Sequence, residues 1–65
     1  MSSSIHAEVS SIADSVGGLR QRVAAIAPSL AGAGAEDLLS ALFEAERSLT
    51  GAERQLERAK RLTQR

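Results

Sequence analysis

The chain has 65 residues, with eight basic and eight acidic side chains, one histidine and no cysteine. This length allows one small domain, whose core is marginal without disulfides, metals, oligomerisation or very regular helix packing. The absence of cysteine excludes a disulfide framework and a thiolate metal site. A formal net charge of zero disfavours a dedicated nucleic-acid-binding protein.

The amino-terminal sequence MSSSIHAEVSS has neither the positive start nor the long apolar core of a signal peptide. No apolar run approaches the roughly 20 residues that a membrane-spanning helix needs. We therefore expect no membrane insertion and a cytoplasmic protein, with export by a route without a signal peptide left open. One phenylalanine is the only aromatic residue, which is typical of coiled coils rather than of conventional globular cores.

The first half of the chain carries a regular heptad pattern. Apolar residues alternate spacings of four and three, with Val9, Val16, Val23 and Leu30 at a positions and Ile5, Ile12, Leu19 and Ile26 at d positions. This spacing predicts an amphipathic helix over about residues 4–27. Gly17 and Gly18 each cost about 1 kcal/mol relative to alanine inside a helix. The pattern keeps its phase across them, which favours one continuous helix over two shorter ones.

A connection is predicted over about residues 28–35. Pro28 has no N–H and clashes with the preceding helical turn, and it also pushes Ala27 away from helical geometry. Gly32 and Gly34 then allow the backbone conformations that a reversal needs. Residues 28–30 can form one separate helical turn.

The second half repeats the heptad pattern and predicts a helix over about residues 36–63. Leucines now occupy the a positions, and alanines occupy most of the d positions. The a positions are Leu42, Leu49 and Leu56, and the d positions are Leu38, Ala45, Ala52 and Ala59. Acidic residues open this helix and basic residues close it, which suits the helix dipole.

The two heptad patterns predict an all-α, antiparallel helical hairpin. If the chain reverses near Gly34, seam residues whose numbers sum to 68 face each other, and Val16 meets Ala52 while Ile12 meets Leu56. Large and small side chains then alternate between layers, as well-packed helices require. The same geometry places Arg20 and Arg22 beside Glu44 and Glu46.

A two-helix hairpin covers only half of each seam side chain, so we expect association with itself or with another protein. The preferred assembly is a dimer that forms a four-helix bundle. Candidate interface residues are Leu39, Phe43 and Leu62, and a strip of small residues around Gly17 and Gly18. Two alternatives stay open: Leu39 and Phe43 shield the loop end of the hairpin, or the glycine strip is a solvated face.

Residues for catalysis or for cofactor binding are not found. His6 has no cysteine or HExxH neighbour and is interpreted as a solvated residue near the basic tail. Glu44 and Glu46 are two residues apart and point to different faces of a helix. The glycines match neither GxGxxG nor a Walker motif. We expect no enzymatic activity, no metal and no cofactor.

Three classes of function remain. The first is a structural or protein-interaction module, acting as adaptor or scaffold through a homo-oligomeric hairpin. The second is a small secreted helical hairpin, because the chain resembles the WXG100-type substrates of type VII secretion in size and architecture. It has no tryptophan, no WxG turn and no carboxyl-terminal tyrosine. The third is a DNA-associated protein that uses Arg54, Arg58, Lys60, Arg61 and Arg65, although acids interrupt this stripe.

Overall fold

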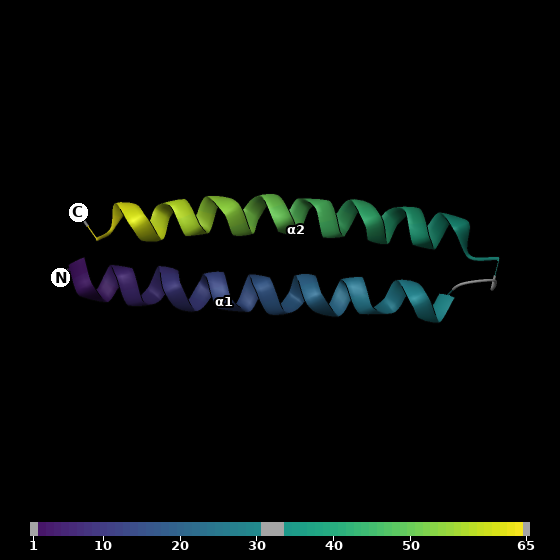
Figure 1. Cartoon of the computed structure of the whole chain (residues 1–65), viewed down its shortest axis with the longest axis horizontal. Coiled ribbons are helices and arrows are strands. Elements are labelled where there is room, and N and C mark those ends of the chain that lie inside the picture. Colours follow the sequence, from purple (N-terminus) through teal and green to yellow (C-terminus); the bar gives the residue numbers. More distant parts are fainter. Residues whose placement is uncertain (1, 31–33, 65) are drawn as a thin grey trace.

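A computed structural model describes residues 2–30 and 34–64. The chain forms helix α1 (Ser2–Ile26), a short 3-10 helix η1 (Ala27–Leu30) and helix α2 (Glu36–Leu62). The two long helices lie side by side and antiparallel, with the start of α1 beside the end of α2 (Figure 1). The molecule is a rod of 51 × 14 × 11 Å. The fold is an all-α helical hairpin, as the heptad patterns predict, and the described residues contain no strand.

The reversal begins where proline stops α1. The α-helix ends at Ile26, and Pro28 lies in η1, whose tighter turn does not need the missing N–H. Gly34 has a positive φ of 69°, a conformation that glycine adopts without the penalty of a Cβ. Gly32 lies outside the described residues. Helix α2 then begins after Ala35, whose carbonyl oxygen accepts a hydrogen bond from the Leu39 N–H at 2.9 Å.

Helix α1 runs without interruption through Gly17 and Gly18. Gly17 is buried, whereas Gly18 is exposed. The burial of Gly17 shows that this position lies toward α2, where the absence of a side chain allows the helices to approach. Among the described residues, no helix is long and apolar enough to cross a membrane.

The contact between the helices uses the a positions and the positions beside them. Ala13, which follows a d position, is 2% exposed and is the one buried hydrophobic residue in the described part of the chain. The residues of α1 with reduced exposure include His6, Val9, Ser10, Ala13, Val16, Gly17, Arg20, Val23 and Ala24. Those of α2 include Leu39, Leu42, Glu46, Leu49, Thr50, Glu53, Leu56, Glu57 and Lys60, and Thr63, which follows the helix, is also half-buried.

The d positions differ from the predicted seam. In α1, Ile5, Ile12, Leu19 and Ile26 are 59%, 43%, 46% and 42% exposed. In α2, Leu38 is 49% exposed, Ala45 and Ala52 are exposed, and Ala59 is half-buried. Both helices are therefore turned away from their d positions. The physical reason is steric, because Ala13 and Gly17 allow a closer approach than the bulky d side chains do.

Both d rows emerge on the same long face of the hairpin. The helices are turned in the same sense, and antiparallel pairing places equivalent flanks of two such helices side by side. We call this surface the d face and define it by seven residues: Ile5, Ile12, Leu19, Ile26, Leu38, Ala45 and Ala52. The predicted facing of Val16 by Ala52 does not occur at the centre of the contact, since Ala52 is exposed.

Candidate interaction surfaces

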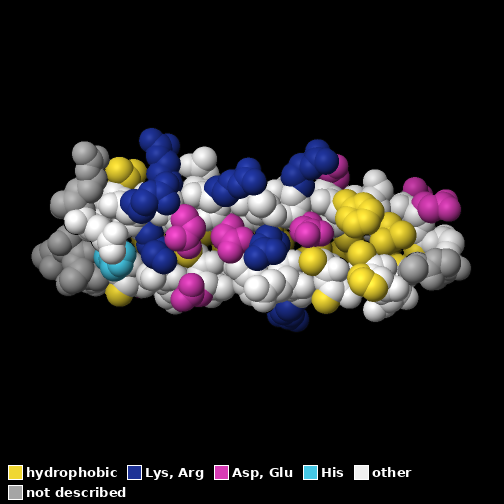
Figure 2. Space-filling view, viewed as in Figure 1, with side chains coloured by type: hydrophobic (Ala, Val, Ile, Leu, Met, Phe, Trp, Pro, Cys, Tyr) yellow, Lys and Arg dark blue, Asp and Glu magenta, His cyan; other side chains and the backbone are white. Residues whose placement is uncertain are grey.

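The long face opposite the d face is polar. We define this polar face by Arg20, Glu53, Arg54, Glu57 and Arg61. Figure 2 shows acidic and basic side chains following the boundary between the two helices, with hydrophobic side chains gathered toward the turn. The charged side chains therefore border the helix contact rather than standing apart from it.

One ion pair joins the helices at the middle of this face. The Arg20 Nε donates a hydrogen bond to Glu53 Oε1 at 2.6 Å, and both side chains are 29% exposed. A Cβ at Gly17 would lie 2.8 Å from Glu53 Oε2, so the glutamate carboxylate occupies the space that the glycine leaves. The sequence placed Arg20 beside Glu44 and Glu46. The structure instead pairs it with Glu53, two helical turns beyond Glu46.

A second polar contact joins the helices where α1 begins and α2 ends. The His6 Nδ1 and Thr63 Oγ1 are 2.7 Å apart, and Thr63 Oγ1 donates to the Lys60 carbonyl oxygen at 2.7 Å. A hydroxyl has one proton, so Thr63 accepts from His6 and the imidazole proton lies on Nδ1. The sequence predicts a solvated His6, but the residue is half-buried and its contact with Thr63 joins the two helix ends.

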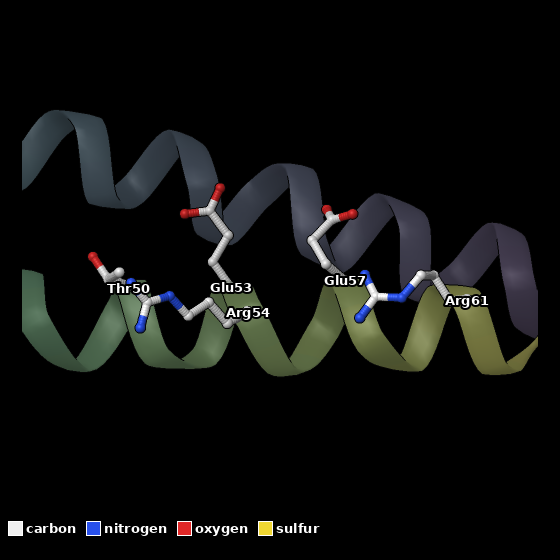
Figure 3. Close-up of a pocket in the computed structure, with 5 residues that line it drawn as sticks. All are labelled: Thr50, Glu53, Arg54, Glu57 and Arg61. Atoms are coloured by element: carbon white, nitrogen blue, oxygen red, sulfur yellow. The ribbon is translucent and has the colours of Figure 1, made fainter.

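A shallow hollow on the polar face is lined by Thr50, Glu53, Arg54, Glu57 and Arg61 (Figure 3). The carboxylates of Glu53 and Glu57 project toward α1, while the two guanidinium groups extend along α2. The Thr50 hydroxyl donates to the Glu46 carbonyl oxygen at 2.9 Å, so its proton is used by the helix backbone. Across residues 2–30 and 34–64, no three metal-ligating side chains gather. The hollow is a set of mixed charges without a nucleophile–base pair.

The basic stripe of α2 alternates with acids in space as it does in sequence. Lys60 Nζ lies 3.5 Å from Glu57 Oε1, and Arg54, Arg58 and Arg61 are exposed. Arg65 lies outside the described residues. A polyanion approaching this stripe would therefore also meet the carboxylates of Glu53 and Glu57.

The hydrophobic residues predicted as an interface do not form one patch. Phe43 is 55% exposed and Leu62 is 49% exposed, but they lie near opposite ends of α2. Leu39 is half-buried. Gly17 is covered by Glu53 and is not free for a further helix, whereas Gly18 is exposed with open space around it. The predicted strip of small residues is therefore used partly inside the hairpin.

The d face is the surface that sequence reasoning missed. A shallow hollow on α1 is lined by Leu19, Arg22, Val23, Ala25 and Ile26, and two of these are d residues. The heptad rule assigns such residues to the seam of a hairpin. The exposed row could have been suspected only from Ala13 and Gly17, small residues on the opposite flank of the a positions, which favour a turned contact.

No protein-family model matches this chain, and no curated protein or solved structure is significantly similar to it.

Proposed function

We propose that the protein is a non-enzymatic protein-interaction module, a helical hairpin that associates with itself and serves as an adaptor or scaffold. One observation carries the proposal. Ala13 is the single buried hydrophobic residue in the described part of the chain, while seven large hydrophobic residues are more than 40% exposed. A chain with so little core is stabilised when a partner covers these side chains.

The exposed area supports the same proposal. The chain exposes 4816 Å², whereas a compact monomer of 6.8 kDa is expected to expose about 3,950 Å² by the usual scaling with mass. The excess of roughly 850 Å² has the size of one side of a standard protein–protein interface, which is about 800 Å². Covering it would give the hairpin the burial of an ordinary small domain.

The test compares molar mass with helix content over a dilution series. Sedimentation equilibrium gives the mass, and circular dichroism at the same concentrations gives the helicity and the melting temperature. We expect a self-associated species at micromolar concentration, with a melting temperature that falls on dilution because folding is linked to association. A monomer that stays fully helical and melts cooperatively at micromolar concentration would contradict the proposal.

A further inference from the structure

We propose that the d face is a homodimer interface. A second copy docks on it about a two-fold axis parallel to the helices, so that α1 of each copy packs against α2 of the other and both turns lie at the same end. The assembly is a four-helix bundle in which every neighbouring pair of helices is antiparallel. This inference rests on the proposed function and names the surface and the partner that it uses.

The d face is complementary to itself in side-chain size. Its α1 row is large, with Ile12, Leu19 and Ile26 each more than 40% exposed, while its α2 row contains the exposed alanines Ala45 and Ala52. Packing α1 against α2 of a second copy places the large row against the small one. Facing layers of large and small side chains interdigitate without voids.

Knobs-into-holes packing gives this contact a register. Around the hollow on α1, Leu19, Arg22, Val23 and Ile26 have the spacing i, i+3, i+4 and i+7, which is the outline of a hole that accepts one side chain from a facing helix. The small side chain of Ala45 from the second copy fits this hole. In the same register, Leu19 enters the hole between Ala45 and Ala52 of the second copy.

The charges at the borders of the d face agree with that register. Glu8 and Arg22 lie at g positions beside the α1 row, while Glu44 and Arg58 lie at c positions, one residue before Ala45 and Ala59. All four residues are exposed in the hairpin. In the proposed dimer, Glu8 lies level with Arg58 of the second copy, and Arg22 lies level with Glu44. Each exposed pair is weak, but the two-fold axis repeats both pairs.

The alternative two-fold axis, perpendicular to the helices, fits the face less well. It places α1 against α1 and α2 against α2, with the two turns at opposite ends. Large side chains would then meet large ones along α1, while Ala45 and Ala52 would meet each other along α2. These contacts need different distances between the helix axes, because alanine pairs allow closer approach than leucine or isoleucine pairs do.

The first experiment measures the arrangement without changing the interface. The chain has no cysteine, so Ser29→Cys provides a single spin-label site, exposed and close to the turn. With both turns at the same end, pulsed electron spin resonance should give a label-to-label distance of roughly 20–30 Å, a few helix diameters. A distance of roughly 45 Å or more, about the length of the helices, would overturn the proposed axis.

The second experiment identifies the face. We expect Leu19→Lys to weaken dimerisation on the order of 100-fold, because it places a charge where an apolar side chain is buried. The matched control is Phe43→Lys, which changes a hydrophobic residue of similar exposure on the opposite face, at 55% against 46% for Leu19. We expect the control to change the dissociation constant less than about threefold. Loss of the dimer in the control with its retention in Leu19→Lys would overturn the inference.

The two proposals fail in different ways. If the wild-type chain sediments as a stable, fully helical monomer, the proposed function fails and this inference fails with it. If the wild-type chain associates but the Ser29 labels are far apart, or Leu19→Lys leaves the association unchanged, only the inference about the d face fails.

Discussion

The two long faces of the hairpin are organised by different side chains. On the polar face, small residues and hydrogen-bonding groups lie at the helix contact: Ala13 is 2% exposed, Gly17 is buried and Arg20 bonds to Glu53. On the d face, isoleucine and leucine remain more than 40% exposed. The two most buried residues of the hairpin are therefore small, while seven large hydrophobic residues stay more than 40% exposed, the reverse of an ordinary core.

The two faces have different roles: small residues allow the helices of one hairpin to pack closely, and large residues remain available for association. Small residues at a contact let two helices come close, and backbone proximity then gives many weak dispersion contacts. Large aliphatic side chains gain most when they are covered on several sides, which two helices cannot provide. We infer that the small residues set the geometry of the hairpin and the large ones supply the free energy of association.

The largest predicted effect comes from enlarging the residue at the centre of the contact. Ala13→Leu adds three carbons where the helix surfaces touch, and overpacking of this kind costs about 1–3 kcal/mol of unfolding free energy. Thermal melts at one fixed chain concentration measure it. The control is Ala7→Leu, the same substitution at an exposed position of the same helix, which should change stability by less than about 0.5 kcal/mol. Equal melting temperatures for the two variants would contradict the close approach at Ala13.

Substitutions at the two adjacent glycines test the same close packing of the helices, with a smaller expected change in unfolding free energy. Gly18→Ala should raise the unfolding free energy by about 1 kcal/mol, because alanine favours the helix and open space surrounds this position. Gly17→Ala has the same helix propensity gain, but its Cβ would lie 2.8 Å from Glu53 Oε2, so the carboxylate must move. We therefore expect a smaller gain at Gly17.

The control for the two glycine substitutions removes the Glu53 side chain. In a Glu53→Ala background, both alanine substitutions should stabilise the helix by similar amounts, measured by denaturant unfolding at fixed chain concentration. A deficit at Gly17 that persists in this background would show that something other than the Glu53 side chain limits the approach.

The hairpin could be predicted from the sequence, but the rotation of each helix about its own axis could not. Heptad spacing, Pro28 and Gly34 define two helices and a reversal, since each depends on local geometry or on a single period. Which surfaces of the two helices meet depends on which flank of the a positions permits the closest approach. Val9 and Val16 at a positions are compatible with contact on the d side or on the side of Ala13 and Gly17. Ala13 and Gly17 decide between the sides by their small size, a property that a pattern of apolar residues does not register.

The ion pair at the centre of the polar face should contribute a modest coupling energy. A double-mutant cycle of Arg20→Ala and Glu53→Ala should give about 0.5–1 kcal/mol, because both side chains are only 29% exposed and join two helices at 2.6 Å. The comparison is a cycle on Glu44 and Arg47, whose closest atoms are 3.8 Å apart and whose side chains are 66% and 80% exposed. This cycle should give about 0.3 kcal/mol or less. Equal coupling in the two cycles would contradict a structural role for the central pair.

The smallest predicted effect concerns the open end of the hairpin. Thr63→Val keeps the shape of the side chain and removes the hydroxyl that accepts from His6, which should cost about 0.5 kcal/mol because helix ends already fray. Thr50→Val is the matched control, since the Thr50 hydroxyl bonds within α2 to the Glu46 carbonyl oxygen and not across the contact.

A spectroscopic reading separates the His6 contact from general fraying. In the wild-type chain, nitrogen chemical shifts of the imidazole should show the proton on Nδ1, because Thr63 Oγ1 already donates to the Lys60 carbonyl oxygen and can only accept from the ring. In Thr63→Val this constraint disappears and the Nδ1-protonated tautomer should lose population. An unchanged tautomer ratio in Thr63→Val would mean that His6 does not bond to Thr63 in solution. The polar contacts between the helices would then extend no farther toward this end than Ala13 and Arg20.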